Sequence, residues 1–192
     1  MKHGDAEGAL FSICAALEET ARRERLPKGR QGFKSFIANN IHIISGIGLG
    51  HPIAGLKIGY SHPDLPLSSD GSARFEDIVY HLIRCGLYHE AALPASVCLT
   101  ENRIGSDNGM LLLPKTLVIG IIVAVVSSPG NVREKTDPSF YVTAIGENFF
   151  LNELWGQRAE VVRRVLNAAQ KRDAANHLAS GAEPTVVGDA AR

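Results

Sequence analysis

The chain has 192 residues, which suits one domain built around a single hydrophobic core. Hydrophobic residues make up 45% of it and charged residues 21%, so the composition excludes a fibrous or wholly disordered protein. The 20 Lys and Arg residues balance the 20 Asp and Glu residues, so binding to nucleic acid or to an anionic membrane would need a local patch of charge.

Helical periodicity recurs along the whole chain. Apolar residues return every three or four positions in several segments, and residues that cap or break helices separate these segments. Asp5 is a candidate N-cap for the first helix and Asn152 for the last, and Ser72 for the helix between residues 72 and 92. The pattern predicts helices over about residues 6–25, 30–44, 72–92, 115–128 and 152–172.

The segments between these helices predict a long loop and a small sheet. Residues 45–72 are rich in Gly, Pro and Ser and keep no period, which is typical of a loop. Residues 97–113 predict an antiparallel β-hairpin that turns at Asn108-Gly109, and the alternating segment 140–145 predicts a strand that joins it. We therefore expect a mainly α domain over residues 1–172, with a disordered tail over 173–192.

Glycines and histidines of the predicted loop do not complete a known site. Gly46, Gly48 and Gly50 lack the Lys and Ser/Thr of a phosphate-binding loop, and His51 and His62 lack a third ligand at metal spacing. We expect neither a cofactor nor a metal ion.

Cysteine usage and hydropathy bear on the compartment. Three cysteines without a CxxC pair are typical of a reducing environment rather than a disulfide framework. The most apolar run, residues 117–126, is about half of the roughly 20 residues that a membrane span needs, and no signal peptide is evident. We expect a cytoplasmic protein that does not enter a membrane.

The predicted helix over residues 72–92 carries an unusual polar set within the stretch EDIVYHLIRCGLYHEAALP. On a helical wheel its core face is apolar, whereas a polar stripe runs along one side. His89 lies five residues beyond Arg84, so in a regular helix the two side chains point in different directions. The stripe consists of Asp77, His81, Arg84 and Tyr88.

The stretch Arg84-Cys85-Gly86-Leu87-Tyr88-His89 resembles the Arg-x(4 to 6)-His motif of the HEPN superfamily. The order of two antiparallel helices, a motif helix and an apolar helix is also similar to that all-helical bundle. ALFSICAALEETARRERLP and LPKTLVIGIIVAVVSSPGN further resemble a bacterial protein family that is similar to HEPN domains. Cys85 stands where many active members carry a polar residue, often Asn.

The resemblance implies a HEPN-like helical bundle that is a metal-independent ribonuclease or an RNA- or nucleotide-binding protein, and that forms a homodimer. His89 would then move a proton at the ribose 2′-hydroxyl or at the leaving oxygen, which suits a side chain that titrates near neutral pH. Arg84 would bind the scissile phosphate through its fork of donors. The residues expected to support them are Asp77, His81, Tyr88 and Glu90.

Other readings of the same residues remain open. Arg84 and His89 could bond to Glu90, Asp77 or the last carbonyls of their own helix, as in a non-catalytic helical interaction module of a bacterial defence or regulatory system. Glu18 or Glu19 could pair with Arg84, or both could lie on a solvated face. A thiol enzyme that uses Cys85 and His81 is a further alternative.

Overall fold

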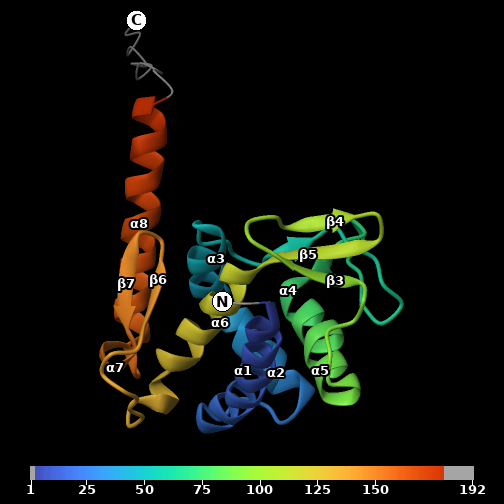
Figure 1. The fold of residues 1–192 in the computed structure, drawn as a ribbon, viewed down its shortest axis with the longest axis horizontal. Helices are drawn as coiled ribbons and strands as arrows, with labels where there is room; N and C mark the ends of the chain where they lie inside the picture. The colour runs from blue at the N-terminus through green and yellow to red at the C-terminus, as the bar shows by residue number, and fades with distance from the viewer. Residues whose placement is uncertain (1–2, 180–192) are drawn as a thin grey trace, which may run out of the picture.

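The computed structural model describes residues 3–179, and helices make up most of this region (Figure 1). The prediction of a mainly α protein is confirmed. The helical segments are α1 (His3–Arg23), α2 (Arg30–Asn39), α3 (Ile41–Leu49), α4 (Phe75–Ile78), η1 (Val79–Arg84), α5 (Cys85–Glu90), α6 (Lys115–Val126), η2 (Pro129–Asn131), α7 (Leu151–Leu154) and α8 (Arg158–Ala179).

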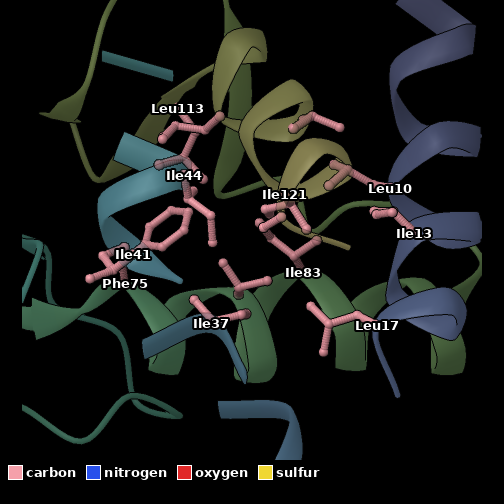
Figure 2. Packing of buried hydrophobic residues seen from close by; sticks show 14 of the residues in the cluster. Leu10, Ile13, Leu17, Ile37, Ile41, Ile44, Phe75, Ile83, Leu113 and Ile121 are labelled. Atoms are coloured by element: carbon pink, nitrogen blue, oxygen red, sulfur yellow. The ribbon is translucent and has the colours of Figure 1, made fainter. Parts of the chain in front are cut away.

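Helix α6 lies at the centre of the core. It is apolar nearly all round because α3 packs against one side of it and α1 against another (Figure 2). Helices α3 and α6 approach closely because glycine faces backbone: a Cβ on Gly120 would lie 2.5 Å from the carbonyl oxygen of Ile44. Apolar side chains of α1, among them Leu10 and Leu17, then cover the pair.

The predicted helix over residues 30–44 is two helices, α2 and α3, that meet at Asn40. The buried Asn40 side chain donates to the Phe36 carbonyl, and the backbone of Asn40 departs from helical angles at φ −110°. Helix α3 then continues to Leu49, into the predicted loop. Gly46 and Gly48 lie within this helix despite their low helix propensity. Both positions require glycine, because a Cβ would collide with Val165 of α8 at Gly46 and with Leu117 of α6 at Gly48.

The motif helix begins later than predicted and is not a regular α-helix. It starts at Phe75, so Ser72 is not its N-cap; instead the Ser72 hydroxyl donates to Asp70. Segment η1 within it is a π-helix, and the Cys85 N–H at its end donates to the Tyr80 carbonyl five residues back. The helix ends at Glu90, where Ala91 takes the left-handed conformation at φ 56°.

The predicted hairpin over residues 97–113 is correct only in its second half. The Asn108-Gly109 turn joins β4 (Gly105–Asp107) to β5 (Met110–Pro114) as expected, but β3 (Val97–Thr100) pairs with the other edge of β5 and runs parallel to it. The buried leucines of β5 take the central position, whereas the polar β4 suits an exposed edge.

Two further strand pairs differ from the prediction. Strand β6 (Tyr141–Ala144) does not join this sheet but pairs with β7 (Glu147–Phe150), which was not predicted. A short pair, β1 (Lys57–Ile58) with β2 (Ala73–Arg74), closes the predicted loop. The chain therefore has one three-stranded and two two-stranded sheets within residues 3–179.

The last predicted helix is also divided and is longer than expected. Asn152 lies within α7 rather than capping a long helix, and its side chain holds the backbone of Thr136. Helix α8 packs on α3 through its first half and then extends beyond the other elements (Figure 1). Residues 173–179 of the predicted tail belong to this helix, and 180–192 lie outside the described residues.

The close contact between α3 and α6 predicts that a single methyl group added at Gly120 lowers the stability of the protein. Gly120→Ala should lower the free energy of unfolding by about 1–3 kcal/mol, because the new Cβ meets the Ile44 backbone, which cannot move aside without shifting α3. Gly8→Ala is the matched control, since Gly8 is exposed on α1 with no atom near its Cβ position; it should raise stability by up to about 1 kcal/mol. Urea unfolding followed by circular dichroism measures both, and equal effects would contradict the close packing.

Candidate functional site

Arg84 lies in a cluster of aromatic and charged side chains between α1 and the motif helix. Its Nε donates to Glu18 Oε1 of α1 at 2.9 Å. Its guanidinium carbon lies 4.4 Å from the ring centroid of Tyr88 and 5.5 Å from that of Tyr80, within the range of cation–π contact. The ion pair and the two rings hold Arg84 in place, so the interpretation that Glu18 pairs with Arg84 is confirmed.

Tyr88 continues this cluster to the protein surface. Its ring lies 5.3 Å from that of Phe11 on α1, and the two residues are 39% and 47% exposed. The two rings together form an exposed aromatic surface at the edge of the cluster. The Arg84 guanidinium therefore lies next to an open aromatic face.

A cavity of about 420 Å³ opens beside the cluster, between α1, the loop that follows it and Tyr88. Leu26, Phe33 and Tyr88 provide apolar walls, whereas charged groups from α1 and the loop line the rest. This volume falls within the roughly 300–1,000 Å³ of typical small-ligand pockets. Glu18 and Tyr88 belong to both the cluster and the cavity, so a ligand in the cavity would contact the groups that hold Arg84.

The electrostatics of the cluster follow from burial and from Glu18. Burial by itself would lower the pKa of Arg84, but the hydrogen bond and charge of Glu18 raise it above its ordinary value, so the guanidinium stays charged. Burial and then the Glu18 charge raise the pKa of Tyr88, which keeps its phenol a neutral hydrogen-bond donor.

His89 and Glu90 lie apart from this cluster, on the last turn of α5. Both side chains are exposed, and within residues 3–179 no hydrogen bond or ion pair holds either of them. The structure therefore does not bring His89 to the Arg84 guanidinium through a fixed contact, and Glu90 does not pair with Arg84.

Asp77 and His81 belong to a second cluster, next to α2. The buried Asp77 pairs with Lys34 of α2, and the His81 ring lies edge-on to Tyr80 at 5.2 Å. Burial, reinforced by the charge of Arg30 and opposed by Asp77, lowers the pKa of His81. The polar stripe drawn on a regular helical wheel is thus split into two groups that face different neighbours.

Comparison with known proteins identifies the family. The model of the Rv1289 family matches residues 1–178. The chain belongs to the Rv1289 family. No curated protein and no solved structure matches it.

The arrangement in this Rv1289-family chain suits binding by charge and stacking. The Arg84 guanidinium has N–H donors beyond the one that bonds to Glu18, and the exposed Tyr88 ring beside it offers a flat surface; phosphates match the first and planar rings the second. No cluster of three or more His, Cys, Asp or Glu residues suited to a metal ion occurs in the described part of the chain. In that same part, no helix combines the length and apolar character that a membrane crossing requires.

Sequence reasoning missed some contributors to the site. Phe11 and Tyr80 were not assigned to it, nor were Phe33 and Lys28, which line the cavity. Phe11 lies on the exposed side of α1, next to the core residue Leu10, and an aromatic residue on a polar helix face was the available signal. The cavity depends on the path of the loop after α1, which the sequence pattern does not specify.

The cluster makes a testable prediction about Cys14, which lies behind Glu18 on α1. Burial and then the Glu18 charge raise the pKa of Cys14 to about 12, so iodoacetamide at mildly alkaline pH should modify it at least roughly tenfold more slowly than the half-buried Cys98. Peptide mass mapping measures the rates, and denaturant should make them equal.

Because the unfolded thiol ionises near pH 9 and the folded thiol near 12, stability should fall as pH rises between these values.

Cys14 modified as fast as Cys98 in the folded protein would contradict the buried environment behind Glu18. Cys98 is the matched control because it lies on β3, away from the cluster.

Proposed function

We propose that this chain is a HEPN-like protein that binds single-stranded RNA or nucleotides through the Arg84 cluster. The observation that carries the proposal is the charged Arg84 side chain held against Tyr88, whose exposed ring lies beside the exposed ring of Phe11. Nucleobases stack on aromatic rings and on guanidinium planes, and Arg also binds phosphate. The neutral whole-molecule charge is consistent with binding at such a local site.

Metal-independent RNA cleavage is the catalytic form of this proposal. Arg84 would stabilise the charge that develops on the scissile phosphate, and His89 would transfer the proton. In this form a ligand phosphate replaces Glu18 as the partner of the guanidinium. Because His89 lies further along the helix and no contact among the described residues holds it near Arg84, a homodimer in which a second copy supplies His89 would complete the site, and the exposed Phe11 and Tyr88 rings supply an apolar contact surface for it.

A non-catalytic interaction module is the second candidate. The ion pair between Glu18 and Arg84 favours it, since an arginine already satisfied by a carboxylate of the same chain is what a structural role requires. In that case Arg84 ties the motif helix to α1, and the exposed aromatic face binds a protein partner.

The binding form predicts a defined effect of Tyr88. Tyr88→Ala should weaken binding to fluorescein-labelled single-stranded RNA by about tenfold, because base stacking on an aromatic side chain contributes about 1–3 kcal/mol. Fluorescence anisotropy measures the affinity. Phe150→Ala is the matched control, since Phe150 is 41% exposed on β7, away from the cluster, and this change should leave binding unaltered. Wild-type protein that binds no RNA or nucleotide would overturn the proposal.

The catalytic form predicts cleavage in EDTA. Wild-type protein should cut single-stranded RNA and leave 2′,3′-cyclic phosphate ends, and His89→Ala should abolish cleavage while RNA binding and the circular dichroism spectrum stay unchanged. Arg84→Lys, which keeps the charge but loses the planar fork, should lower the rate by on the order of 10². If the protein binds RNA but cleaves none of a broad panel of sequences, the binding form of the proposal stands and the catalytic form is wrong.

A further inference from the structure

We propose that the cavity beside Arg84 is a binding site for a guanine base and that Glu18 recognises the Watson–Crick edge of that base. This inference rests on the proposed function, since it names the base that the Arg84 cluster would take. It requires a cavity with apolar walls, a carboxylate with free acceptor positions and a cation for the phosphate, and the structure holds each of these.

The apolar walls are formed by aromatic and aliphatic side chains. Phe33 of α2 is buried at 1% exposure and closes the inner end, Leu26 lies on the loop after α1, and Tyr88 stands at the side nearest Arg84. Of these side chains, Tyr88 is the aromatic ring exposed enough for a purine to stack on it. The volume of about 420 Å³ leaves room for a sugar and a phosphate beyond the base.

Glu18 is the carboxylate in the cavity that has acceptor positions to spare. The other lining carboxylate, Glu19, already accepts two hydrogen bonds from Arg22 and one from Arg23. Glu18 accepts one, at Oε1 from Arg84, and an ionised carboxylate has about four acceptor positions. Arg84 thus acts as a positioning residue that orients the Glu18 carboxylate.

Guanine is the base whose edge matches a carboxylate. Its N1–H and N2–H₂ groups are adjacent donors that point the same way, so they can bond to the two oxygens of Glu18 together. Adenine and cytosine place one amino donor beside a ring nitrogen that is an acceptor, and uracil flanks its single N–H with two carbonyl oxygens. For each of these a carboxylate meets at least one repelling lone pair.

Positive charge at the cavity suits the attached phosphate. Lys28, on the loop after α1, lines the cavity and makes no ion pair with the described residues. Two donors of the Arg22 guanidinium bond to Glu19, and its remaining N–H groups add to the positive charge at the cavity. A nucleotide with its base against Tyr88 and its phosphate toward Lys28 pairs each part of the ligand with its complementary group.

The test measures base preference directly. Isothermal titration calorimetry with GMP, AMP, CMP and UMP should give GMP at least about tenfold tighter binding than the others, as expected for two hydrogen bonds to a charged group. Oligouridine with and without one central guanosine, measured by anisotropy, distinguishes a base within RNA from a free nucleotide. Glu18→Gln should remove the preference in whichever assay shows it, because an amide places a donor opposite one of the guanine donors.

Glu160→Gln is the matched control, since it makes the same change on a carboxylate of α8 that is bonded to Arg163 and does not line the cavity; it should keep the preference. Circular dichroism and thermal unfolding check that the variants fold, and Glu18→Asp, which keeps the charge but withdraws the carboxylate, should also weaken GMP binding. Equal affinity for the four bases, or a preference that survives Glu18→Gln, would overturn the guanine site. RNA binding without base preference would leave the proposed function standing, whereas no binding to RNA or any nucleotide would remove both.

Discussion

The close approach of α3 and α6 is the constraint on which the rest of the fold depends. Gly120 lets the backbone of α6 approach that of α3. Gly48, on α3, likewise leaves room for Leu117 of α6. With these two helices in contact, α1 can cover them from one side and α8 from the other, where Gly46 accommodates Val165. A larger residue at any of these glycines would separate helices whose apolar surfaces are buried only while they touch.

The motif helix is attached to this core by its apolar face and to α1 by one ion pair. Because η1 is a π-helix, the side chains before and after it do not follow the regular helical spacing, and Asp77 faces α2 while Arg84 faces α1. The partial exposure of Arg84 and Glu18, 22% and 37%, limits the net contribution of their ion pair to stability, which for exposed pairs is at most about 1 kcal/mol. The pair therefore orients the two side chains more than it stabilises the fold.

Much of the helical content could be predicted from the sequence because apolar periodicity is a local signal, as in α1 and α6. The errors occurred where tertiary contacts override local preference. Gly46 is helical because α8 packs on it, and β5 lies between β3 and β4 because its leucines are buried, although a hairpin is the simpler local solution. For the site, the pairing of Glu18 with Arg84 could be stated as an alternative, whereas the different partners of Asp77 and Arg84 depend on how α1 and α2 pack, which a helical wheel does not represent.

The candidate functions differ in which partner the Arg84 guanidinium has when the protein acts. In cleavage a phosphate must displace Glu18, so a partly exposed ion pair that contributes little to stability is an obstacle of modest size. In base recognition the pair stays intact and Arg84 supports Glu18 from behind, which agrees with a guanidinium held between Tyr80 and Tyr88. In an interaction module the pair only joins α1 to the motif helix, and this leaves the cavity between them without a role. Since Glu18 and Tyr88 line that cavity as well as hold Arg84, base recognition is the role that uses these three side chains without rearranging any of them.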